Sequence, residues 1–172
     1  MVSFLRPREV RPALGFLGLA LFALASACRV SENFQDPPPE LLSRAEPLPV
    51  TLSNELRGLQ AKTDSAGAET TFKVGKLLQR LFSSTDGRSF LSYVDARIDV
   101  TWSPPSWGTR YTLVLALQVE GQYHLIQSTG TSESLEGPTI SGRQAIEGCI
   151  AETYEQVAAL LGRSSRRSDA QR

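Results

Sequence analysis

Histidine, cysteine and methionine are scarce in this chain of 172 residues, which has one histidine, two cysteines and one methionine. Zinc sites need several cysteine or histidine ligands at close spacing, so the sequence excludes a zinc site of this kind. A serine–histidine–aspartate relay would have to use His124, yet no Gly-x-Ser-x-Gly elbow surrounds any serine. The glycines are isolated and form no phosphate-binding loop. We therefore expect a structural role for His124, a non-catalytic protein, and no metal or cofactor.

An excess of positive charge is also absent, because 18 basic residues balance 18 acidic ones. Residues 1–27 hold three of the arginines and one glutamate, so the rest of the chain has 15 basic and 17 acidic residues, a formal charge of −2. No basic stripe of the kind that nucleic-acid binding needs is present, and we expect no nucleic-acid partner. Residues 163–172 carry four arginines and read as a disordered tail. Contact of this tail with acidic lipid or cell-wall polymer is the alternative.

An export signal occupies residues 1–27. Arg6, Arg8 and Arg11 precede an unbroken apolar run at 13–24, and small residues follow that run. A basic segment, a short apolar segment and small residues make up a secretory signal. The apolar run is too short to span a bilayer comfortably, since this takes about 20 residues.

The end of this signal resembles the lipobox of bacterial lipoproteins, in which small residues precede a cysteine that is lipidated and becomes the new N-terminus. Ala25, Ser26 and Ala27 precede Cys28, although the lipobox prefers leucine at the position of Ala25. The resemblance implies a lipid-type (palmitate) anchor on Cys28 and a place in the cell envelope. Under the usual sorting rule, Arg29 favours the outer membrane, on its periplasmic face, over the inner membrane.

The alternative for Cys28 is ordinary cleavage after Ala27, which leaves a free secreted protein. A Cys28–Cys149 disulfide would then be allowed, because exported compartments are oxidising. Cys149 lies in a helical apolar stripe, however, where a small buried hydrophobe is the expected role.

Residues 28–49 are rich in proline, with three consecutive prolines at 37–39 and two more at 47 and 49. Proline removes backbone donors and favours extended conformations, so this segment is expected to be a tether.

A single globular domain is expected at residues 50–162. Its apolar periodicity predicts a strand at 50–56, a polar break at 63–67, a helix at 74–82, strands at 94–102, 111–119 and 123–132, and a helix from a capping box at 141 to 162. The strand at 94–102 alternates strictly, with Val94 and Trp102 on the apolar side. The order favours an α+β fold of the βαβββα type, a mainly antiparallel sheet with two helices on one face.

The layout resembles the ABC-type transport auxiliary lipoproteins, a family of small envelope lipoproteins. The resemblance covers Val50 to Leu161 and rests on the helix at 77–82 before the first long strand, the hairpin at 111–132 and the final helix near Gly142. Lipoproteins that activate cell-wall synthases, and the lipopolysaccharide-assembly lipoprotein, have a similar layout. These families imply a binding or adaptor role and no catalytic residues.

Two tryptophans give the best candidate for a partner contact. Trp102 and Trp107 flank the sequence Ser-Pro-Pro-Ser at 103–106, and exposed tryptophans are favoured at interfaces. The alternative is structural, with Trp102 continuing the buried face of its strand and Trp107 covering the end of the sheet. Asp95 and Asp99 lie about 13 Å apart along one strand, too far for an acid/base pair, and are read as a solvated face.

The sequence therefore favours an envelope adaptor or accessory subunit of a transport or assembly complex that binds a protein partner. A carrier or chaperone for lipid or another amphipathic ligand is the alternative, and it predicts a continuous apolar cleft between helices and sheet. An activator of cell-wall synthesis is a further alternative.

Overall fold

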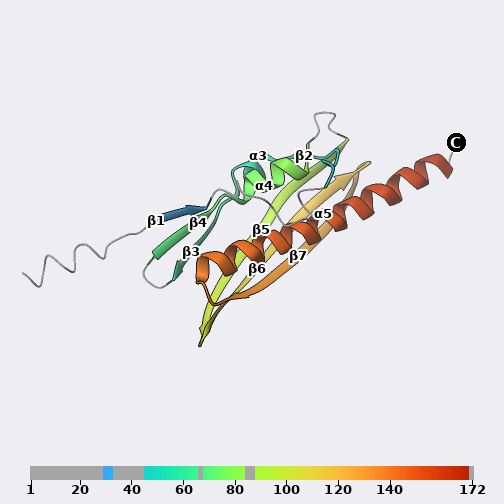
Figure 1. The fold of residues 1–172 in the computed structure, drawn as a ribbon. Helices are drawn as coiled ribbons and strands as arrows, with labels where there is room; N and C mark the ends of the chain where they lie inside the picture. Colours follow the sequence, from blue (N-terminus) through green and yellow to red (C-terminus); the bar gives the residue numbers. More distant parts are fainter. Residues whose placement is uncertain (1–28, 33–44, 66–67, 84–87, 171–172) are drawn as a thin grey trace, which may run out of the picture.

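The computed structural model describes residues 29–32, 45–65, 68–83 and 88–170 (Figure 1). Its elements, in chain order, are β1 (Arg29–Glu32), β2 (Thr51–Leu52), α3 (Asn54–Arg57), β3 (Ala61–Ser65), β4 (Ala68–Phe72), α4 (Val74–Leu81), β5 (Ser89–Ser103), β6 (Ser106–Val119), β7 (Gln122–Ser134) and α5 (Pro138–Ala170).

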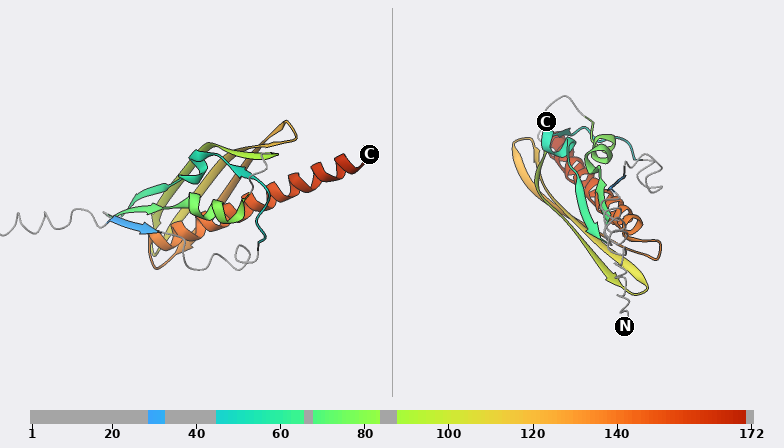
Figure 2. Two further views of the ribbon diagram at one scale, coloured as in Figure 1. Left: turned by 90° about the horizontal axis from the view of Figure 1, so that it is seen from above. Right: turned by 90° about the vertical axis from the view of Figure 1, so that its left-hand side faces the viewer.

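The main sheet has the order β2-β5-β6-β7. The strands β5, β6 and β7 form an antiparallel meander, while the short β2 runs parallel to β5. A smaller sheet has the order β1-β4-β3. The helices lie on one side of the main sheet, and the other side is left open (Figure 2). The prediction of an α+β fold with a mainly antiparallel sheet and helices on one face is confirmed.

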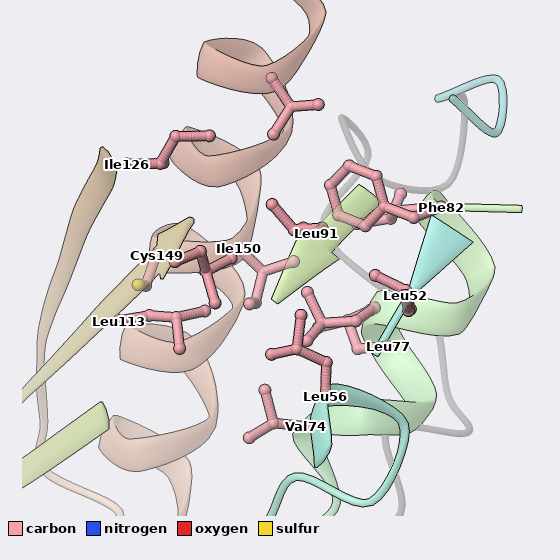
Figure 3. Close-up of a cluster of buried hydrophobic side chains, with 14 of the residues drawn as sticks. Leu52, Leu56, Val74, Leu77, Phe82, Leu91, Leu113, Ile126, Cys149 and Ile150 are labelled. Carbon is pink, nitrogen blue, oxygen red and sulfur yellow. The ribbon is translucent and has the colours of Figure 1, made fainter. Parts of the chain in front are cut away.

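The core lies between the main sheet and the helices. The apolar stripe predicted for the first helix is confirmed, because Val74, Leu77, Leu78 and Leu81 of α4 are buried. Figure 3 shows Val74 and Leu77 on the side of the cluster that faces Ile150 of α5 and Leu91 of the sheet. On β6 every second residue from Tyr111 to Leu117 is fully buried, as its period-two pattern predicts.

The hairpin between β6 and β7 closes through a two-residue turn, Glu120-Gly121. Both residues have positive φ, 49° and 81°. Such turns match the right-handed twist of the strands and favour glycine. The tight reversal predicted at this point is confirmed.

A β-bulge in β5 overturns part of the predicted alternation. Tyr93 pairs with Leu115 and Asp95 pairs with Val114, so Val94 is an extra residue without a partner on β6. A bulge shifts the side-chain phase by one position. Leu91 and Tyr93 therefore face the helices before the bulge and Ala96 after it, whereas Val94, predicted inside, is 49% exposed.

The predicted first strand at 50–56 is wrong beyond Leu52. The hydroxyl of Ser53 accepts the N–H of Leu56 at 3.3 Å and begins the short helix α3, so Leu56 enters the core from a helix. An N-cap of this kind favours a helical turn over further strand.

The hairpin of β3 and β4 was not predicted, and Thr63, assigned to a polar break, lies within it. Thr63 is buried and alternates with exposed Lys62 and Asp64. The buried positions of β3 are alanine and threonine, which give a weak apolar signal.

The predicted capping box of the last helix is wrong, because α5 begins earlier, at Pro138. Proline suits the first position of a helix, where its missing N–H has no intrahelical partner. Ser141 is instead fully buried, and its hydroxyl lies 2.7 Å from that of Thr109 on β6. Gln144 accepts a hydrogen bond from Ser132 at 2.6 Å.

The other end of α5 also differs from the prediction, since the helix continues through Gly162 to Ala170. Residues 163–170, predicted as part of a disordered tail, are helical. A glycine inside a helix costs only about 1 kcal/mol, and no proline follows it.

Parts of the predicted tether are attached to the domain. Leu48 donates its N–H to Leu81 at 2.8 Å, and its carbonyl accepts the N–H of Ser83 at 3.0 Å. Tyr154 of α5 donates its hydroxyl hydrogen to the carbonyl of Glu46 at 2.7 Å. The domain therefore begins at or before residue 45, earlier than the predicted boundary at residue 50.

Gly130 on β7 allows the backbones of the sheet and α5 to approach closely. A Cβ at this position would overlap the carbonyl oxygen of Ala145 and lie 2.6 Å from the amide nitrogen of Cys149. Both atoms belong to the backbone of α5, so they cannot move away by a side-chain rotation.

We predict that Gly130→Ala lowers the free energy of unfolding by about 3 kcal/mol, because α5 must move away from the sheet. The matched control is Gly148→Ala on α5, where the nearest atom, Cα of Gly130, would lie 4.0 Å away. This control should be neutral or stabilising by up to about 1 kcal/mol, because alanine favours the helix. Urea unfolding followed by circular dichroism measures both. Equal stability of the two variants would contradict the close approach.

Candidate partner-binding site

Trp102 and Trp107 form a cross-strand pair at the tip of the β5–β6 hairpin. Their ring centroids lie 4.8 Å apart, with an angle of 43° between the ring planes. Trp102 is 52% exposed, whereas Trp107 is partly buried. The tilted contact between the rings adds about 0.5–1.5 kcal/mol beyond the area that they bury. The structure brings the predicted pair together and leaves one ring open to solvent.

The turn that carries the pair is short and is held by hydrogen bonds. Ser103 pairs with Ser106 around Pro104 and Pro105, and the hydroxyl of Ser106 donates to the carbonyl of Ser103 at 3.4 Å. Below the pair, the hydroxyl of Thr101 donates to the carbonyl of Gly108 at 3.3 Å. Because proline also restricts the backbone, little conformational freedom remains for a partner to remove.

The hairpin tip projects beyond the start of α5, so the helix does not cover it (Figure 1). Trp107 pairs with Ser134 of β7, and Leu135, the next residue along the chain, is 74% exposed. The sheet therefore ends in an aromatic pair, Trp102 and Trp107, with the ring of Trp102 open to a partner.

The face of the sheet opposite the helices is charged near this tip. Asp99 accepts a hydrogen bond from Arg97 at 2.9 Å, and both side chains are solvent-exposed. Asp95 accepts the N–H of Ala96 at 2.9 Å. An exposed pair of this kind contributes at most about 1 kcal/mol. These carboxylates lie on a solvated face, as the sequence predicts.

His124 lies on β7 opposite Leu117 and is partly buried. It shares the lining of a groove with Gln156 and Leu160 of α5. Within the described ranges, no group of three histidine, cysteine or acidic side chains is placed to hold a metal ion.

Cys149 on α5 is fully buried, as predicted from its place in the apolar stripe. Burial raises the pKa of its thiol to about 12. Two neighbouring hydroxyls, those of Tyr111 and Ser128, are also buried and have no hydrogen-bond partner among the described residues. Burial raises the pKa of Tyr111 as well. Cys28 and the predicted signal lie outside the described residues.

We predict that Cys149 does not react with iodoacetamide at pH 8 in the folded protein and reacts rapidly in urea. The reactive form of a thiol is the thiolate, which is scarce far below a pKa of about 12. Peptide mapping by mass spectrometry distinguishes this site from Cys28. Rapid labelling of Cys149 without denaturant would contradict its burial.

None of the helices in the described part of the chain is long and apolar enough to cross a membrane.

Comparison with known proteins gives no family assignment. No protein-family model matches the chain, and no curated protein matches it. Among solved structures, rare lipoprotein B from Shewanella oneidensis matches 74% of this chain and 100% of its own chain, at 14% identity and a TM-score of 0.34. A likeness of this size is too remote to carry an argument about fold or function.

Proposed function

We propose that this protein is a lipid-anchored accessory protein of the bacterial envelope that binds a protein partner through the tip formed by Trp102 and Trp107. The observation that carries the proposal is the contact of Trp102 and Trp107 on a short hairpin turn, which leaves the ring of Trp102 exposed. Large aromatic side chains that are already held in place contribute most to protein interfaces, because little entropy is lost on binding. The contact is an adaptor function, and the protein is not an enzyme.

The anchor is supported by the sequence before Cys28, where a basic segment, an apolar run and small residues end at the cysteine. Several acyl chains on one residue, each stabilised by about 0.8 kcal/mol per buried CH₂, give stable attachment. With Arg29 after the cysteine, the periplasmic face of the outer membrane is the proposed location.

The packed core favours this function over a carrier of lipid or another amphipathic ligand. The carrier hypothesis requires a continuous apolar cleft between helices and sheet. In the described structure this layer contains fully buried side chains from both sides, among them Leu113, Ile146 and Ile150. A ligand would have to displace them. An activator of cell-wall synthesis would also bind a protein partner. The identity of that partner distinguishes such an activator from an accessory subunit of a transport or assembly complex.

We predict that the protein extracted from membranes has the mass of a chain beginning at Cys28 plus acyl chains. A Cys28→Ala variant should lack these chains and should not remain in the membrane fraction. Intact-mass spectrometry of both proteins measures this. A wild-type chain that begins at Cys28 without any modification would contradict the anchor and indicate a secreted protein.

We predict that replacing both Trp102 and Trp107 by alanine weakens the partner complex at least about 30-fold, because one interface tryptophan can contribute about 2 kcal/mol or more. Chemical crosslinking in membranes, quantified by mass spectrometry, measures the complex. The matched control is Val94→Ala, since Val94 is an exposed apolar residue on β5 far from the tip. If the double variant crosslinks to the same partner as strongly as the control does, the tip is not the contact.

A further inference from the structure

The edge of the main sheet at β7 is closed over only part of its length. Glu152 of α5 accepts the N–H of Thr129 at 2.8 Å, and Gln156 donates to the carbonyl of Gln127 at 3.1 Å. These side chains supply the hydrogen bonds that a further strand would otherwise make. At Gln127 and Thr129, therefore, α5 occupies the edge.

The same edge is open at Tyr123 and Leu125. The carbonyl of Gln127 and the N–H of Thr129 both point away from β6. Along a strand, the direction of the backbone groups repeats every second residue. The backbone N–H and carbonyl groups of Tyr123 and Leu125 therefore point outward as well. In the described part of the chain, no group pairs with them.

A groove lies beside this open edge. It has a volume of about 490 Å³ and is bounded by residues 123–126 of β7 and by Gln156, Ala159 and Leu160 of α5. Among the side chains that the structure describes, no acidic, lysine or arginine side chain lines it. Next to it, Tyr123 and Leu125 are 74% and 71% exposed, the greatest exposure of any large apolar residues on the described strands. The groove thus combines unpaired backbone groups with a lining of uncharged polar and apolar side chains.

Proteins usually protect an open strand edge with charges, proline, bulges or a covering segment, because it pairs with other chains. Residues 122–126 contain no lysine, acidic residue or proline. The hydrogen bonds from α5 stop where the groove begins, which distinguishes this stretch from Gln127 and Thr129.

We propose that Tyr123 to Leu125, together with the facing side of α5, binds an extended segment of a protein partner as an added strand. The outward groups of Tyr123 and Leu125 pair with the backbone of the segment. Its alternate side chains lie against Ala159 and Leu160 on one face and beside Leu125 on the other. The segment is uncharged where it faces α5, because the groove offers no opposite charge, and pairing ends at Gln127.

This site is separate from the tryptophan tip. Tyr123 lies near the start of β7, whereas Trp107 is paired with Ser134 at its end. The proposal therefore depends on neither the tip nor the anchor.

The test uses the full chain and short synthetic peptides that alternate valine and threonine, followed by fluorescence anisotropy. The matched control peptide has the same side chains but carries N-methyl groups on alternate residues, so it lacks the donors that would face the edge. We expect binding of the first peptide and at least about tenfold weaker binding of the second. No binding of the first peptide, or equal binding of both, would overturn the proposal.

Leu125→Pro tests the edge directly. Its N–H points away from β6, so proline removes an outward donor and leaves the bonds to β6 intact. We expect at least about tenfold weaker peptide binding, whereas Leu125→Thr, which keeps the donor, should bind within about threefold of the wild type. Ala159→Trp fills the groove from an exposed helix position without altering the strand, and should also weaken binding at least about tenfold.

Three further results would overturn the proposal. One is unchanged peptide affinity in both Leu125→Pro and Ala159→Trp. Another is self-association of the wild type that disappears in Leu125→Pro, measured by sedimentation, since the occupant would then be a second copy of this chain. The third is loss of peptide binding in the Trp102 and Trp107 alanine variant, which would place the peptide at the tip. Retained peptide binding in that variant supports a separate site.

Discussion

The architecture depends on the contact between the backbone of β7 at Gly130 and the backbone of α5 at Ala145 and Cys149. This approach brings the helix close enough for Ile146 and Ile150 to be fully buried beside the sheet. It also places Ser141 in contact with Thr109, which fixes the start of the helix relative to β6. The meander can leave its other face in water because this one helix covers so much of the inner face.

The same helix determines which parts of the sheet remain available. Its first residues stop short of the hairpin tip, so Trp102 stays exposed. Its middle residues Glu152 and Gln156 bond to Thr129 and Gln127 on the edge of β7, and the next turn lines a groove there. Two accessible surfaces, one aromatic and one backbone-lined, thus lie towards opposite ends of β7.

Elements with a strong apolar period were predictable from the sequence, among them β6 and α4. The two tryptophans were identified from the sequence as a candidate contact. Their pairing was not predicted, because β6 begins at Ser106 rather than at residue 111. The bulge at Val94 was not predictable, since it depends on pairing with β6 rather than on any pattern within β5. The hairpin of β3 and β4 was missed because, apart from Phe72, the side chains that it buries are small or polar. The capping box was wrong because the hydroxyl of Ser141 contacts Thr109. The edge groove escaped prediction because unpaired backbone groups leave no mark in the sequence.

The position of α5 at the end of the chain has a consequence for how the protein is made. Synthesis proceeds from the N-terminus, so the meander can pair before the helix that covers it is available. During that interval the inner face and the whole edge of β7 are bare, and such edges promote association between chains. A chain that stops before Ala145 would remain in this state, because it lacks the part of α5 that contacts Gly130.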